Sequence, residues 1–231
     1  MQEEHITVSE FYEGSPIEEV ESYLINKLLS ETTVIDKERG YLSIEFINQV
    51  IEPQPKVAAA RIIIEQLKNR NMLENIDYIV EIPKFGTYLA GTISDRTGIP
   101  MAPVRKDGKI PGQWKNIIKL EDEIPSFTTG IPSSYVINGL HPEDRILLVD
   151  DFIAHGETAT HFIQKLYEQG IEPVAVASYL IKYFQPGYNR ILQETGVQPI
   201  GAIGVDGITE DGKIIPSKGI YSTRYNPTPT P

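Results

Sequence analysis

A short apolar segment followed by two adjacent carboxylates constrains this chain more than any other feature. Residues 146–149 (Ile-Leu-Leu-Val) are typical of a buried parallel strand. Asp150 and Asp151 follow directly, at the end of the strand where open α/β sheets bind their ligands. Residues 154–158 then form a loop with one glycine that enters an amphipathic helix, where free backbone N–H groups suit a phosphate. The segment therefore indicates a sugar-phosphate site, with the acids near hydroxyl groups or a magnesium ion.

Acids that follow a strand also occur in proteins of other classes. P-loop ATPases carry them, but this sequence contains no Gly-x-x-x-x-Gly-Lys-Ser/Thr motif, which excludes that class. The phosphoacceptor aspartate of a receiver domain stays open, although it leaves residues 154–158 without a role. Two solvated loop acids are the plainest alternative, and the apolar strand before them argues against it.

The charge and the absence of cysteine exclude several classes of function. A net charge of −11 over 231 residues disfavours nucleic acid as a partner, because neutralising phosphates needs a basic surface. With no cysteine, the chain has neither a disulfide framework nor a thiolate nucleophile. No apolar run reaches the length of a membrane span, and the acidic N-terminus lacks a signal-peptide core. These features predict a cytoplasmic protein with no membrane partner.

Strand-like and helix-like segments alternate along most of the chain, which predicts a mainly parallel sheet flanked by helices. Ser15 is expected to cap the first helix. The expected strands are residues 32–35, 41–44, 78–82, 101–104, 135–137, 146–149, 174–181 and 200–205. The further helices are residues 56–69, 87–96, 157–168 and 189–194. Residues 106–130 are polar and weakly periodic.

The segment from Ile146 to Thr158 resembles the ribose-phosphate signature of type I phosphoribosyltransferases. Residues 43–53 and 182–187 resemble segments of the bacterial xanthine enzymes, and residues 104–112 resemble the mobile loop of the adenine enzymes. The resemblance spans roughly residues 41–207. It implies the α/β fold of that family, with a small hood and a mobile lid. We expect residues 1–40 to form an N-terminal helical or hood extension, residues 41–207 the phosphoribosyltransferase domain, and residues 208–231 a C-terminal segment with a disordered Pro/Thr tail.

The resemblance also implies roles at the donor site. Asp150 and Asp151 would contact the ribose hydroxyls of phosphoribosyl pyrophosphate and its Mg²⁺, the metal being held through substrate or water. The 5′-phosphate would be cradled by Ala154, His155, Gly156, Glu157 and Thr158. Glu157 sets a negative charge beside that phosphate. Because glutamate is independently favoured at a helix start, it is equally consistent with a side chain that points away.

Two further segments would hold the pyrophosphate. Lys84, Phe85 and Gly86 lie where the family has its pyrophosphate loop, although an ordinary strand–helix turn accounts for them as well. Arg105, Lys106 and Lys109 would belong to the lid that closes over the polyanion, with a solvated basic patch as the alternative. Arg105 and Lys106 join the two aspartates as the expected catalytic residues.

The base pocket is expected at the strand that ends in Lys182. A flat purine needs an apolar or aromatic platform with a few convergent polar groups. The candidates are Leu42, Phe46, Asn48, Lys182 and Phe184. Phe46 and Phe184 also suit the core, and Asn48 a turn, whereas packing does not account for a lysine that ends an apolar strand. By resemblance, Lys182 would donate to the purine O6.

These features predict an enzyme, a glycosyltransferase of purine salvage. It would form a nucleoside 5′-monophosphate and pyrophosphate from phosphoribosyl pyrophosphate and a purine, with xanthine or another 6-oxopurine preferred. An adenine phosphoribosyltransferase and a non-catalytic regulator that senses the ribosyl donor are the alternatives. By resemblance, the protein would be a homodimer.

Overall fold

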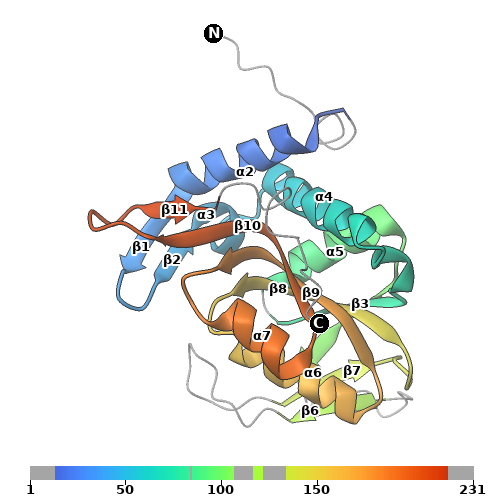
Figure 1. Ribbon diagram of the computed structural model, residues 1–231. Helices are drawn as coiled ribbons and strands as arrows, with labels where there is room; N and C mark the ends of the chain where they lie inside the picture. The colour runs from blue at the N-terminus through green and yellow to red at the C-terminus, as the bar shows by residue number, and fades with distance from the viewer. Residues whose placement is uncertain (1–13, 84, 107–116, 122–133, 218–231) are drawn as a thin grey trace, which may run out of the picture.

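A six-stranded sheet forms the centre of the molecule (Figure 1). The computed structural model describes residues 14–83, 85–106, 117–121 and 134–217. The strand order is β11-β10-β9-β8-β3-β4, and all neighbours are parallel except β11, which is antiparallel to β10. The strands are β3 (Tyr78–Glu81), β4 (Met101–Ala102), β8 (Arg145–Ile153), β9 (Glu172–Lys182), β10 (Gln198–Ile208) and β11 (Ile214–Pro216). The expected parallel α/β architecture is confirmed.

Helices cover both faces of this sheet, which accounts for the almost wholly apolar character of its central strands. One face carries α2 (Ile17–Glu31), α4 (Pro53–Asn69) and α5 (Gly86–Thr97). The other carries α6 (Glu157–Glu168) and α7 (Gly187–Thr195). Within the described residues, no helix combines the length and apolar character that a membrane crossing requires.

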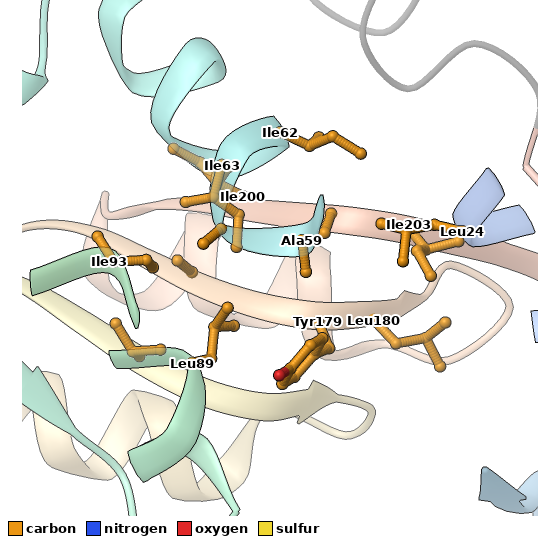
Figure 2. Close-up of a cluster of buried hydrophobic side chains, with 14 of the residues drawn as sticks. Leu24, Ala59, Ile62, Ile63, Leu89, Ile93, Tyr179, Leu180, Ile200 and Ile203 are labelled. Carbon is orange, nitrogen blue, oxygen red and sulfur yellow. The ribbon is translucent and has the colours of Figure 1, made fainter. Parts of the chain in front are cut away.

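Buried side chains from three helices meet the sheet in the larger of two core clusters (Figure 2). Leu24 of α2, Ile63 of α4 and Leu89 of α5 belong to it together with strand residues such as Tyr179 and Ile200. Helix α2 therefore shares one core with the parallel sheet. The second cluster lies on the face of α6 and α7 and includes Phe162 and Ile191.

A two-stranded hairpin joins α2 to the rest of the chain, as expected. It consists of β1 (Thr32–Asp36) and β2 (Tyr41–Ile44) and leads into α3 (Glu45–Asn48). The expected domain boundary at residue 40 falls in the turn of this hairpin. The expected capping by Ser15 is wrong: Pro16 occupies the cap position of α2, and the helix has no side-chain cap hydrogen bond.

Proline divides a segment that the sequence suggested was one strand. Because Pro103 has no N–H to donate to a ladder, β4 ends at Ala102 and β5 (Val104–Lys106) begins a separate antiparallel sheet. That sheet has the order β5-β7-β6, with β7 (Ser134–Asn138) and β6 (Ile117–Glu121). Strand β6 lies inside the polar stretch and was not expected. A short 3-10 helix, η1 (Leu73–Asn75), precedes β3.

Candidate active site

Asp150 and Asp151 lie where β8 extends past its neighbour β3. The β3–β8 ladder runs from Tyr78 opposite Ile146 to Glu81 opposite Val149, so both aspartates follow its last pair. On the other side, β9 stays paired with β8 beyond this point, with Asp150 opposite Ser178. The two carboxylates therefore stand at the carboxyl end of the parallel strands, the edge where the sequence predicted a ligand site.

Each carboxylate uses one oxygen to hold the local backbone. Oδ1 of Asp150 accepts a hydrogen bond from the N–H of Asp151 at 2.8 Å, and Oδ1 of Asp151 accepts one from the N–H of Phe152 at 2.8 Å. Burial, together with the negative charge of Asp151, raises the pKa of Asp150 well above its ordinary value. A cation or hydroxyl donors placed here would relieve that unfavourable charge.

The pair suits a metal ion that is shared with a substrate. Magnesium is usually held by one or two carboxylates together with substrate phosphates, and it keeps several waters. Each aspartate has a second oxygen that the backbone bonds do not use. No group of three or more His, Cys, Asp or Glu side chains in the described residues could hold an ion without such help. The site therefore fits Mg²⁺ bound jointly with a ligand.

The loop after β8 is held against the start of α7. Gly156, at φ +78°, precedes α6, and no side chain caps that helix, so its first N–H groups are available to an anion. The N–H of Gly187 donates to the carbonyl of Ala154 at 2.8 Å. A Cβ at Gly156 would come within 2.8 Å of the Gly187 backbone, and one at Gly187 would come within 2.3 Å of the Ala154 oxygen. Both glycines are required by this close approach.

Glu157 bonds to a residue outside the loop. Its Oε1 accepts a hydrogen bond from Nη1 of Arg190 at 2.8 Å, and the same nitrogen lies 2.9 Å from the carbonyl oxygen of His155. The acid therefore pairs with α7, which favours the second of the two orientations considered from the sequence. Arg190 was not singled out, because it lies 33 residues from Glu157 and no local pattern connects them.

The turn after β3 packs under the same edge of the sheet. Gly86 begins α5, and a Cβ there would lie 2.7 Å from the carbonyl oxygen of Val149. Glycine therefore lets this turn approach the strand that carries the aspartates. Phe85 is partly exposed beside it, and Lys84 lies outside the described residues.

The first two of the three cations expected in the lid lie in a strand. Arg105 and Lys106 belong to β5, opposite Val136 and Tyr135 of β7, and Arg105 is exposed. The N–H of Val104 donates to Oε1 of the buried Glu81 at 3.3 Å, which connects the start of β5 to the end of β3. Lys109 lies outside the described residues.

Lys182 brings a charge into the interior at the end of β9. The residue is only 6% exposed, its Nζ donates to the carbonyl of Gly40 at 2.9 Å, and the Phe152 ring centroid lies 5.4 Å away. Burial lowers the pKa of Lys182 to about 8, and the nearby charge of Asp151 acts in the opposite direction. The ammonium group is thus close enough to Asp151 for the charge of that carboxylate to act on it.

The turn of the β1–β2 hairpin covers this lysine. Besides the Gly40 bond, Nε2 of Gln185 donates to the carbonyl of Arg39 at 2.8 Å. A Cβ on Gly40, which has φ +64°, would lie 2.7 Å from the ring of Phe184. Two segments about 140 residues apart therefore meet over the end of β9. No local sequence pattern predicts this contact.

The remaining candidates for the base pocket are either buried in the core or hydrogen-bonded within the protein. Leu42 and Phe46 are 2% and 1% exposed and belong to the larger core cluster. Oδ1 of Asn48 accepts a hydrogen bond from the N–H of Ile44 at 3.0 Å, which closes the turn around α3. The structure therefore brings Lys182 together with Phe152 and places Phe184 against Gly40, whose carbonyl accepts from Lys182, whereas core packing accounts for Phe46.

Known proteins with similar sequences and folds are purine phosphoribosyltransferases. No protein-family model matches the sequence. The hypoxanthine/guanine phosphoribosyltransferase of Methanothermus fervidus is 31% identical over 156 residues, which is 66% of this chain and 76% of the relative. The xanthine phosphoribosyltransferase of Streptococcus thermophilus is 26% identical over 194 residues, covering 83% and 95%. The structure of adenine phosphoribosyl transferase from Trypanosoma brucei, solved with AMP, pyrophosphate and ribose-5-phosphate, superposes with a TM-score of 0.61 at 20% identity and covers 82% of this chain and 83% of that one.

The mostly parallel sheet with helices on both faces is the fold of the type I phosphoribosyltransferases. With relatives at this level of identity and coverage, the chain belongs to the purine phosphoribosyltransferases, which are glycosyltransferases. The relatives include hypoxanthine/guanine, xanthine and adenine enzymes.

Proposed function

We propose that this purine phosphoribosyltransferase acts on xanthine or a related 6-oxopurine, with phosphoribosyl pyrophosphate as the donor. The observation that carries the choice of base is Lys182, a buried ammonium group beside Asp151 and the ring of Phe152. An ammonium group can donate three hydrogen bonds and accepts none. It suits the O6 carbonyl of an oxopurine and opposes the 6-amino group of adenine, which is itself a donor.

On the donor side, the proposal assigns the 5′-phosphate to the loop from Ala154 to Thr158. Backbone N–H groups at the start of α6 and the Thr158 hydroxyl would bind its oxygens. Asp150 and Asp151 would accept hydrogen bonds from the ribose hydroxyls and share Mg²⁺ with the pyrophosphate. When bound, the ion neutralises charge that develops on the leaving group. Phe85, Gly86, Arg105 and, outside the described residues, Lys84 and Lys109 complete the proposed pyrophosphate site, with Lys106 beside them.

The transfer needs no covalent enzyme intermediate. The bond from the ribose C1 to the pyrophosphate oxygen breaks as a purine ring nitrogen bonds to C1, and the purine loses a proton. In this family the transition state resembles an oxocarbenium ion, so catalysis rests on holding the two substrates in line and on excluding water. Phe184 and the hairpin turn over Lys182 would shield the base side.

The decisive experiment is pyrophosphate release with Mg²⁺ and the ribosyl donor, measured with xanthine, guanine, hypoxanthine, adenine and orotate. Turnover with oxopurines and little with adenine is expected. Preference for adenine would remove Lys182 as the selector and favour the adenine alternative. Donor binding by calorimetry without turnover on any base would favour the non-catalytic sensor. Sedimentation of the same protein tests the homodimer that we expect from the family resemblance.

A further inference from the structure

We propose that Arg190 is a positioning residue for the donor phosphate, which fixes the shape of the loop from Ala154 to Glu157 and neutralises Glu157. This inference rests on the proposed function, because it concerns the loop assigned to the 5′-phosphate. Arg190 lies on α7, outside the ribose-phosphate segment, and one of its nitrogens bonds both to the His155 carbonyl and to the Glu157 carboxylate.

Hydrogen bonds from α7 set the direction of the N–H groups in the loop before α6. In a trans peptide unit the C=O and the following N–H point in opposite directions. The carbonyls of Ala154 and His155 both point to α7, where they accept hydrogen bonds from the N–H of Gly187 at 2.8 Å and from Arg190 at 2.9 Å. The N–H groups of His155 and Gly156 are therefore turned away from α7. Arg190 holds one of the two peptide units in this orientation.

Arg190 also balances the charge around the loop. Asp150, Asp151 and Glu157 set three carboxylates within eight residues of a proposed phosphate site, in a chain of net charge −11. The Glu157 side chain is 57% exposed and that of Arg190 is 29% exposed, with 2.8 Å between their charged atoms. Without the guanidinium group, Glu157 would keep its charge and be free to turn toward the phosphate, and the like charges would repel.

A role for Arg190 confined to α7 is the rival hypothesis. Nε of Arg190 lies 3.6 Å from Glu194, one helical turn away, and such pairs give a helix only modest support. The two hypotheses differ in which substrate is affected. Loss of helix support lowers the melting temperature alone, whereas loss of loop positioning weakens binding of the ribosyl donor and spares the purine.

The test compares Arg190→Met, Glu157→Gln and the double variant with the unmodified protein. Calorimetry would measure the Kd of phosphoribosyl pyrophosphate and of ribose 5-phosphate, and steady-state assays the KM of donor and purine. For Arg190→Met we expect donor binding about tenfold weaker at low salt, with the purine KM unchanged. The double variant should bind the donor more tightly than Arg190→Met does, because the unpaired carboxylate is gone. Glu157→Gln alone is the reference against which the double variant is compared.

Two further variants serve as controls. Arg145→Met removes an ion pair of similar exposure, with Asp77, at the opposite end of β8, and Glu194→Gln removes the contact within α7; both should bind the donor normally. Donor affinity of Arg190→Met equal to that of the unmodified protein would overturn this inference and leave the proposed function intact, as would a double variant that binds the donor no more tightly than Arg190→Met does. Failure of the unmodified protein to bind the donor would overturn both proposals.

Discussion

At the scale of single residues, the site concentrates charges in places where a protein rarely leaves them unpaired. Lys182 is buried against an aromatic ring with one backbone carbonyl as its acceptor, and Asp150 lies half-buried beside a second carboxylate. Both carry pKa values displaced in the direction that disfavours the charged form. Displaced pKa values are common at functional sites, where a bound ligand can supply the opposite charge or the hydrogen bonds that the protein does not.

The displaced pKa of Lys182 predicts a pH dependence for purine binding. The ammonium form donates to the purine oxygen, and its fraction falls as the pH rises through about 8. The purine KM should therefore increase with pH above that value, while the donor KM does not follow the same curve. In Lys182→Arg the group stays charged throughout this range, so the pH-dependent increase should disappear. An identical increase in that variant would show that another group titrates.

We expect Asp150 to favour substrate binding and to lower the free energy of unfolding. Its pKa is raised on folding, so the unfavourable charge is absent below the unfolded value of about 3.9 and fully present above the folded one. Asp150→Asn should raise the melting temperature by about 2–5 °C at pH 7, and the gain should shrink as the pH falls toward 4. Turnover should be lost. Asp77→Asn is the opposite case, because Arg145 lowers the pKa of Asp77, and that variant should be less stable at pH 7.

At the scale of elements, α7 and the loop before α6 behave as one unit. Their backbones touch at Gly156 and Gly187, with no room for a side chain between them. Because Lys182 ends β9 and α7 begins at Gly187, only a short turn connects the proposed base site to the support of the proposed phosphate loop.

Adding one methyl group at this contact should separate the two elements. In Gly187→Ala the new Cβ would lie 2.3 Å from the Ala154 oxygen and 2.9 Å from the Gly156 nitrogen. Both are backbone atoms, so the loop must shift, and we expect donor binding at least about tenfold weaker. Gly91→Ala, in the interior of α5 with nothing within 4 Å of its Cβ, should gain up to about 1 kcal/mol of stability and leave the donor Kd unchanged. Equal donor affinity in both variants would contradict the tight contact.

At the scale of the whole molecule, α2 and the parallel sheet should unfold together. Leu24 is fully buried in the cluster that also contains Ile63 and Tyr179. Leu24→Ala should lower stability by about 2–5 kcal/mol and shift a single cooperative transition, as followed by calorimetry, without changing either KM. Two separate transitions would instead show that the N-terminal segment, residues 1–40, unfolds independently of the sheet.

The alternation of strands and helices could be read from the sequence because its signal is local. Runs such as residues 146–149 are continuous and apolar, and glycines at positions 98 and 196 end helices with φ near +75°. The division at Pro103 was missed because the apolar pattern continues across it. Strand β6 was missed because it is short and lies within a polar stretch.

The candidate site was predictable only where its residues are consecutive in the chain. The aspartates and the loop before α6 fall in one segment, so strand and helix signals position them together. The contacts of Arg190 with Glu157 and of Lys182 with Gly40 join residues 33 and 142 positions apart. Only the folded sheet and its hairpin create those contacts, and neither partner has a local feature that identifies the other.

The hairpin turn over Lys182 and the loop before α6 are formed by separate segments of the chain. Residues Lys37, Glu38 and Arg39 are exposed, and they form the turn between the two strands of a sheet that is separate from the parallel sheet. A change of sequence there alters no core packing and no residue of the loop before α6. Under the proposed function, the preference for one base over another can therefore change through a few surface positions, while the residues assigned to the ribosyl donor stay the same.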